Sequence, residues 1–212
     1  MTIATRITEA DLVGTPITGL LAGANLRTPC GQRRVENLRP GDLVVTRDSG
    51  LQPVRLIWTH SVCAADVAAN PGLAPVWLGP RAIGPMMPQR GLRLAPGHRV
   101  LIPGWRLVDQ ADTAACLVAA HEISGSTDAA YVDRSEDNFV LYNIVFDTHQ
   151  IFCANGLPVE SFHVSREARA SLQPDVRAEL DRVFPDLGTL PQDPPRAAYP
   201  LVDQVQYAPE YA

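Results

Sequence analysis

The sequence contains no lysine, because all 18 of its basic residues are arginines. Enzymes that form a Schiff base or use a lysine nucleophile are therefore excluded. Charge is sparse as well: charged residues make up 19% of the 212 residues, and the net charge is −5. Nucleic-acid-binding surfaces need a clustered basic face, so we expect no nucleic-acid partner.

Cysteines are few and widely separated, at Cys30, Cys63, Cys116 and Cys153. No pair has the short spacing of a zinc site or of a CxxC redox motif. A chain of this size does not need disulfides for stability, so we expect four free thiols in a reducing compartment. We expect no metal or other cofactor, although histidines and cysteines on separate strands leave a converging metal site as an alternative.

The sequence has no long apolar run. Residues 1–12 lack the basic start and apolar core of a signal peptide. The apolar stretch from Ile17 to Leu26 is too short, and too interrupted by Gly and Asn, to span a bilayer. We therefore expect a cytoplasmic protein without a membrane partner. A protein partner stays possible, but the sequence does not identify one.

What the sequence does contain is a series of short β-like runs between turn signals, with 19 prolines and 15 glycines. Runs rich in Val, Ile and aromatic residues predict strands. They lie at residues 42–47, 54–62, 75–78, 92–102 and 142–153. Asn155-Gly156 is typical of a tight turn, and the Ala-rich stretch 109–120 favours one or two helical turns. The pattern as a whole predicts an all-β fold.

Three segments are distinguished along the chain. Residues 1–16 are expected to form a polar N-terminal arm, and residues 17–163 the β domain. Residues 164–212 are expected to hold a short C-terminal helix and an extended tail containing proline and tyrosine. The helix is predicted at 173–184, where Pro and Asp occupy the first turn and apolar residues fall on one face.

Three motif blocks lie within the β domain. The first, residues 31–42, has the pattern Gly-x-x-x-Val-Glu-x-Leu-x-Pro-Gly-Asp, the second spans residues 94–102, and the third spans residues 146–162 with Cys-Ala-Asn-Gly inside it. In this order they resemble the Hint domain of hedgehog proteins and inteins, in its bacterial stand-alone form. The resemblance implies a Hint-type β fold and covers roughly residues 17–163.

The resemblance also implies an activity and its residues. Hint domains carry out autoprocessing, which in inteins leads to protein splicing. It begins when the thiol or hydroxyl of the first residue attacks the preceding carbonyl in an N-to-S or N-to-O acyl shift. In the family that residue is a Cys twelve positions before the glycine that matches Gly31, which places the nucleophile position at Gly19. Glycine has no nucleophile, so we expect a degenerate active site and no catalysis.

The other blocks supply the remaining candidates. The family's second block has a Thr or Ser followed three positions later by a His that serves the scissile amide nitrogen; the matching residues are Ala95 and His98. Ala95 is therefore a second degenerate position, whereas His98 is retained, either for that role or as a structural histidine. In the third block the resemblance points to Asp147 and His149, although Asp147-Thr148 is equally good turn chemistry.

Splicing inteins end this block with His-Asn before a Cys, Ser or Thr, whereas residues 160–162 here are Glu, Ser and Phe. Without the Asn no side-chain amide can cyclise, so splicing is excluded. Three functions follow as hypotheses: an inert Hint scaffold that binds or modulates another molecule, residual autoproteolysis at Thr18-Gly19, or a cysteine hydrolase that uses Cys30 or Cys153.

Overall fold

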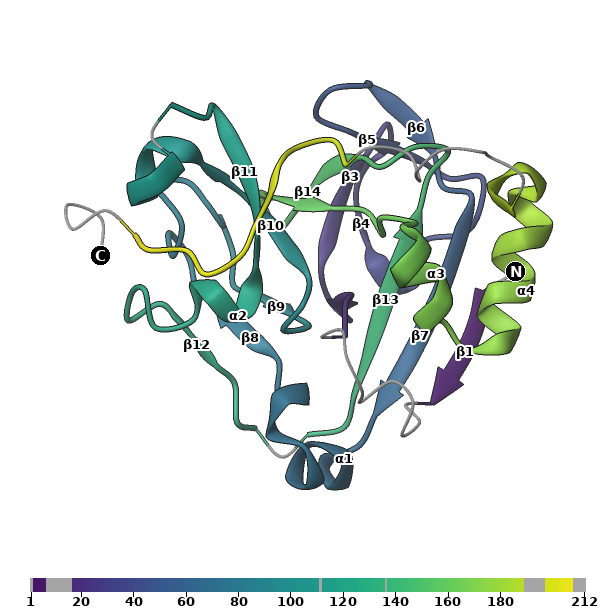
Figure 1. Cartoon of the computed structure of the whole chain (residues 1–212), viewed down its shortest axis with the longest axis horizontal. Helices are drawn as coiled ribbons and strands as arrows, with labels where there is room; N and C mark the ends of the chain where they lie inside the picture. Colours follow the sequence, from purple (N-terminus) through teal and green to yellow (C-terminus); the bar gives the residue numbers. More distant parts are fainter. Residues whose placement is uncertain (1, 7–16, 111, 136, 189–196, 208–212) are drawn as a thin grey trace.

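A computed structural model describes all residues except 1, 7–16, 111, 136, 189–196 and 208–212. Most of its regular structure is β, arranged in two large sheets and a separate hairpin (Figure 1). In spatial order, the first sheet consists of β1 (Thr2–Arg6), β7 (Leu56–Val62), β13 (Phe139–Val145), β2 (Leu20–Leu21), β9 (Leu92–Leu94), β8 (Val76–Leu78) and β12 (Ala130–Val132).

The second sheet brings together segments from both ends of the chain. In spatial order it consists of β16 (Leu201–Val202), β11 (Ala115–Ala119), β10 (Arg99–Pro103), β15 (Leu157–Glu160), β14 (Ile151–Ala154), β3 (Asn25–Thr28) and β4 (Gly31–Arg34). The hairpin pairs β5 (Leu43–Val45) with β6 (Leu51–Pro53). One main core cluster draws buried side chains from both sheets and holds them together.

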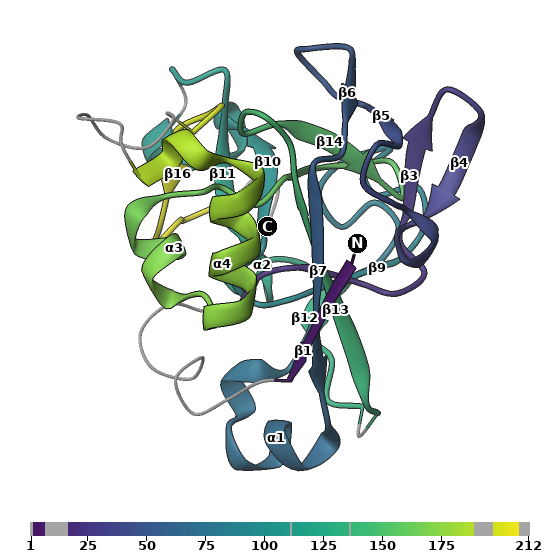
Figure 2. The same ribbon diagram turned by 90° about the vertical axis from the view of Figure 1, so that its right-hand side faces the viewer.

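Helices are short and lie outside the sheets. They are α1 (Ala64–Ala69), α2 (Ala120–Ile123), α3 (Arg166–Ser171) and α4 (Pro174–Val183), with 3₁₀ turns η2 (Val35–Asn37), η3 (Pro71–Leu73), η4 (Gly104–Arg106), η5 (Val108–Gln110) and η6 (Pro185–Gly188). Figure 2 shows α3 and α4 stacked together on one side of the molecule. Val176 and Leu180 of α4 are fully buried and belong to one cluster with Trp58 of β7. The C-terminal helix is thereby packed on the first sheet.

The structure confirms the all-β class, and several predicted elements appear within the expected ranges. The Asn155-Gly156 turn forms with φ of 50° and 85°, values that this pair tolerates well. The C-terminal helix is also present as α4, preceded by α3, which the sequence analysis did not predict.

Two segments differ in detail from what the sequence predicts. In the stretch 109–120, for which one or two helical turns were predicted, helical structure among the described residues occurs only at the two ends, in η5 and at the start of α2. Residues 115–119 form β11, because they pair with β10 in the second sheet and their side chains are largely buried. In the N-terminal arm, Thr2–Arg6 forms β1, which pairs in parallel with β7; the rest of the arm, 7–16, lies outside the described residues. In both places pairing with a neighbouring strand decided the conformation.

Candidate functional site

The Thr18–Gly19 peptide lies directly before β2, against the turn that joins β9 to β10. The carbonyl oxygen of Gly19 accepts a hydrogen bond from the Ala95 amide at 3.0 Å, and that of Ile17 accepts one from the Gly97 amide at 2.9 Å. The peptide between Thr18 and Gly19 is trans. Ladder-like bonds on both sides therefore fix this peptide in place.

His98, in the same turn, contacts the nitrogen of that peptide. The Gly19 N–H donates a hydrogen bond to His98 Nδ1 at 3.3 Å. Nδ1 is therefore the acceptor, and in the neutral ring the proton resides on Nε2. The side chain is 4% exposed, and Nε2 has no hydrogen-bond partner among the described residues.

The protonation state of His98 follows from its burial. Burial lowers the pKa of His98 to about 4, the negative charge of Glu160 partly offsets this effect, and the nearby His149 adds to it. His98 is therefore neutral at neutral pH.

Asn143 of β13 holds the other side of the peptide, and the sequence analysis missed it. Its Nδ2 donates to the Thr18 carbonyl oxygen at 3.2 Å, and its Oδ1 accepts from the Thr18 hydroxyl at 2.9 Å. Asn143 is buried. A buried amide is stable only when it is hydrogen-bonded. The signal that would have found it is an isolated Asn inside the strand sequence Leu-Tyr-Asn-Ile-Val.

Ala95 offers only its backbone to the site. Its side chain is fully buried in an apolar cluster with Leu21 and Leu141. The second-block position that holds a hydroxyl in the family is therefore part of the core here.

Gly19 has little room for a side chain. Its φ is +132°, a conformation that other L-residues rarely adopt. A Cβ atom at this position would lie 3.0 Å from Leu141 Cβ and 3.3 Å from Asn143 Nδ2. Both the backbone conformation and the neighbouring strand β13 therefore suit glycine.

His149, from the third block, lies buried on the other side of His98. Its Nδ1 accepts a hydrogen bond from the Ala198 amide at 3.0 Å, and its Nε2 lies 3.3 Å from Glu160 Oε2. That second contact is close but lacks hydrogen-bond geometry. The ring of His163 lies 4.9 Å from that of His149, centroid to centroid. His149 and His98 therefore both lie close enough to Glu160 to feel its charge.

Glu160 is the carboxylate at the centre of this environment. It is buried at the end of β15, and its Oε1 accepts a hydrogen bond from the Arg99 amide at 3.0 Å. The sequence analysis considered Glu160 only as a position at which a splicing residue is lacking. No sequence motif marked it as part of the site.

Asp147 is not brought into this group. It forms an ion pair with Arg55, and both side chains are roughly half exposed. It also contributes nothing to the cavity beside Gly19. Of the five residues predicted from the sequence, Gly19, Ala95 and His98 lie together, His149 lies next to them, and Asp147 lies apart.

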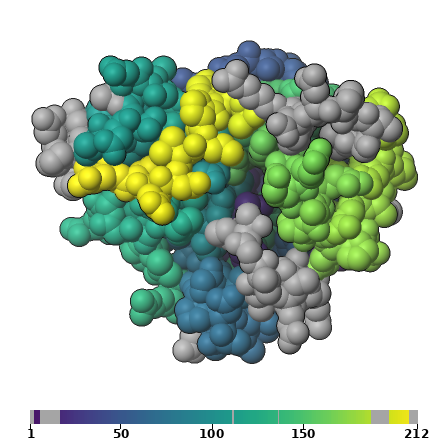
Figure 3. Space-filling view, in the orientation of Figure 1, coloured from purple at the N-terminus to yellow at the C-terminus, as the bar shows by residue number. Residues whose placement is uncertain are grey.

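A cavity of about 450 Å³ opens beside the Thr18–Gly19 peptide. Thr18, His98 and Glu160 are among the residues that line it, and α2, α3 and the C-terminal segment also contribute to its wall. Figure 3 shows a hollow between the C-terminal segment in yellow and the helical region in green. The volume lies within the range of small-molecule sites.

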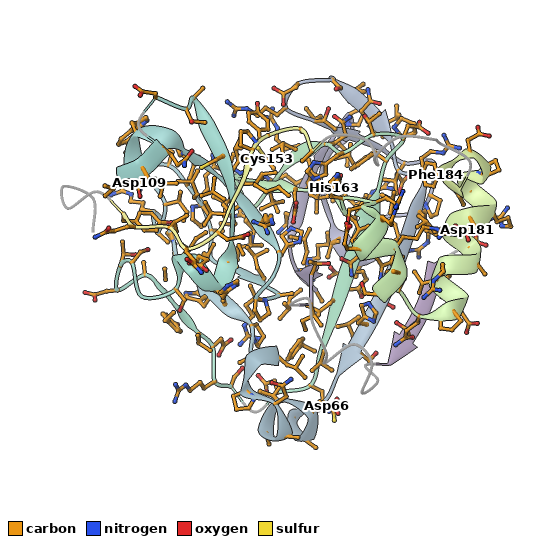
Figure 4. The ribbon with its side chains drawn as sticks, in the orientation of Figure 1. Asp66, Asp109, Cys153, His163, Asp181 and Phe184 are labelled. Carbon is orange, nitrogen blue, oxygen red and sulfur yellow. The ribbon has the colours of Figure 1, made fainter. Side chains whose placement is uncertain are left out.

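The cysteines lie elsewhere. Cys30 is exposed at the turn between β3 and β4, and Cys153 is half-buried on β14, where Figure 4 labels it. Burial raises the pKa of the Cys153 thiol, although Arg27 and Arg47 oppose this effect. A raised pKa favours the unreactive thiol form. Neither cysteine lines the cavity.

The described residues contain neither a candidate metal cluster nor a helix that could cross a membrane. No group of three or more His, Cys, Asp or Glu side chains is placed to hold a metal ion there. In that same part of the chain, no helix has the length and apolar character needed to cross a membrane.

Comparisons with solved structures show similarity to three intein-type domains. The bacterial intein-like domain from Clostridium thermocellum is 12% identical, with a TM-score of 0.43, and the match covers 69% of this chain and 99% of that one. The gp41-1 intein is 14% identical, with a TM-score of 0.41, and the match covers 68% of this chain and 98% of that one. The MchDnaB-1 intein is 11% identical, with a TM-score of 0.42, and the match covers 66% of this chain and 98% of that one.

Among proteins with curated descriptions, the comparison found no match. The sequence model of the Hint domain, by contrast, matches residues 18–166, which is more than half of the chain. It begins at Thr18, beside the peptide that His98 and Asn143 hold, and it extends through all three motif blocks. This chain therefore belongs to the Hint-domain family.

Proposed function

We propose that this protein is a Hint-domain scaffold that holds the peptide of the acyl-shift site without cleaving it. The observation that supports this most strongly is the environment of Gly19. Its N–H is bonded to His98, yet residue 19 has no side chain, and its positive φ and close neighbours disfavour one. The domain accordingly retains the hydrogen bonds that hold the peptide and lacks the reacting group.

The chemistry of the shift shows what is missing. A thiol or hydroxyl at residue 19 would attack the Thr18 carbonyl carbon, forming a thioester or ester, while the C–N bond breaks and the Gly19 nitrogen takes up a proton. Asn143 is placed to polarise the carbonyl oxygen, as oxyanion-type donors do. No atom is present to make the attack.

Proton delivery is weakened as well. A proton donor to the departing nitrogen must carry that proton at the working pH. His98 Nδ1 instead accepts the Gly19 N–H, and burial keeps the ring neutral well below neutral pH. The same histidine that grips the peptide is therefore poorly suited to protonate it.

We further propose the division expected from the sequence: an N-terminal arm at 1–16, the Hint unit at 17–163 and the C-terminal helices and tail at 164–212. Packing of α4 on Trp58 and pairing of β16 with β11 mean that the last segment is attached to the Hint unit. Binding or modulation of a partner would then be the role left to the scaffold.

The test is an intact-mass measurement of the full chain over several days at pH 7.5, with and without hydroxylamine or a thiol. We expect an unchanged mass in every sample. Loss of residues 1–18 would show cleavage at Thr18-Gly19, and loss of residues 1–17 would show attack by the Thr18 hydroxyl. Either result would overturn the proposal.

A second measurement addresses the cysteine alternative. Thiol alkylation that abolished turnover of an added ester would indicate a cysteine hydrolase. Variants Cys30→Ser and Cys153→Ser would then identify the nucleophile. We expect the unmodified protein to show no turnover of the ester, because burial raises the pKa of Cys153 and neither cysteine lines the cavity.

A further inference from the structure

The C-terminal segment, residues 197–207, lies across the second sheet and forms one wall of the cavity (Figures 1 and 3). Leu201 and Val202 pair in parallel with β11, and the Pro200 carbonyl accepts a hydrogen bond from the Leu117 amide at 2.8 Å. Asp203 forms an ion pair with Arg99 at 3.0 Å. The Tyr199 hydroxyl donates to Asp48 and accepts from Arg47, and Val202 packs against the main core. The cavity is therefore partly enclosed by a segment with several anchors, one of which is a hydrogen bond from Ala198.

One of those contacts depends on a histidine. The Ala198 N–H donates to His149 Nδ1, which must be unprotonated to accept it. The neutral ring then carries its proton on Nε2, facing Glu160. The start of the C-terminal segment is thus bonded to a single tautomer of a buried side chain.

Several charged or titratable side chains surround His149. Glu160 from β15 faces Nε2, the ring of His163 packs against it, and His98 lies within electrostatic range. Asp147, two residues earlier, is already paired with Arg55. In a ring that carries protons on both nitrogens, Nε2–H faces Glu160, while Nδ1–H points at the Ala198 N–H, donor against donor.

We propose that His149 is an acid-operated latch for the C-terminal segment. With a neutral ring, Nδ1 holds Ala198 and the segment closes its side of the cavity. Protonation pairs the ring with Glu160, removes the acceptor for Ala198 and frees the start of the segment, so that residues 198–203 open more readily. The cavity wall formed by Leu201 and Asp203 then opens. This inference does not depend on whether Thr18-Gly19 is ever cleaved.

Hydrogen–deuterium exchange of the full chain tests the latch, since histidine is the side chain that ordinarily protonates between pH 5 and 8. Protection of the peptide covering residues 197–207 is measured at pH 7.5 and pH 5.0. A synthetic peptide of the same residues corrects for the intrinsic effect of pH on exchange. We expect protection to fall about tenfold at pH 5.0, a factor in keeping with one hydrogen bond, while the β7 peptide keeps its protection.

The matched variant is His149→Gln, whose amide oxygen accepts from Ala198 but cannot be protonated. Its C-terminal segment should stay equally protected at both pH values. His121→Gln, on α2 at the far wall of the same cavity, should behave like the wild type. Unchanged protection in the wild type at pH 5.0 would overturn the latch, as would a full tenfold loss in His149→Gln. If His149→Gln does not fold, the wild-type result and His163→Gln decide: the latch requires His163→Gln to retain the acid response.

Discussion

The amide of Gly19 donates a hydrogen bond to Nδ1 of His98, across 79 positions of sequence. This bond joins the residue just before β2 to the second motif block, in the turn before β10. It also requires a neutral imidazole, because a protonated ring has no acceptor to offer. Fold stability and the protonation state of His98 are therefore coupled at this point.

The first prediction concerns acid stability. Because the pKa of His98 is about 4 in the fold and about 6.5 in an unfolded chain, the unfolded state takes up more protons between these pH values. The stability contributed by the neutral ring is complete above pH 6.5 and is lost as the pH falls to 4. The expected loss is about 3 kcal/mol. Urea unfolding at pH 7, 6, 5 and 4 measures it.

The control for this prediction is His98→Gln, which has no titrating group at the site. Carboxylates remote from the site contribute equally to both proteins, so the difference between the two pH profiles reports on His98 and its interaction with Glu160. We expect the wild type to lose more stability than the variant over the window from 6.5 to 4. Parallel profiles would show that His98 is not held neutral.

A second prediction compares two glycines with positive φ. Gly19→Ala places a Cβ 3.0 Å from Leu141 Cβ at φ of +132°, whereas Gly31→Ala at φ of +100° meets nothing within 4 Å. Backbone strain alone costs on the order of 1 kcal/mol, and overpacking adds 1–3 kcal/mol. Gly19→Ala should thus destabilise the protein by about 3 kcal/mol and Gly31→Ala by about 1 kcal/mol in chemical unfolding. Equal effects would mean that β13 yields to a side chain at residue 19.

The sequence was informative where the chemistry is local. Gly19 and His98 could be located from the spacing of the motif blocks, and a hydrogen bond joins the two residues in the structure. The Asn155-Gly156 turn was likewise predictable, because its backbone preference belongs to those two residues themselves.

The rest of the site depends on contacts between distant segments, which no local pattern encodes. Asn143 reaches Thr18 across 125 positions, and Ala198 reaches His149 across 49. Residues 115–119 are rich in alanine and look helical alone, but pairing with β10 makes them a strand. Asp147 and His149 are two residues apart, yet one faces Arg55 at the surface and the other is buried.

A third prediction tests how firmly the C-terminal helix is attached. Leu180 of α4 is fully buried in the cluster that contains Trp58. Leu180→Ala removes that packing and should destabilise the protein by about 2–4 kcal/mol. Arg182→Ala, whose side chain is 69% exposed and forms an ion pair with Glu179 of the same helix, is the control. It should change the free energy of unfolding by less than about 0.5 kcal/mol. A small effect of Leu180→Ala would mean that α4 is not part of the cooperative unit.

A fourth prediction concerns the four thiols. Cys30 and Cys63 are exposed, whereas Cys116 is buried and burial raises the pKa of Cys116 and of Cys153. Because the thiolate is the reactive form, a thiol reagent at pH 7.5 should label Cys30 and Cys63 rapidly and the other two slowly. Mass mapping of the labelled peptides measures each site, and denatured protein should label at all four. The double variant Cys30→Ser/Cys63→Ser should lose the rapid phase. Rapid labelling of Cys153 in the native protein would instead reveal an activated thiol and revive the hydrolase alternative.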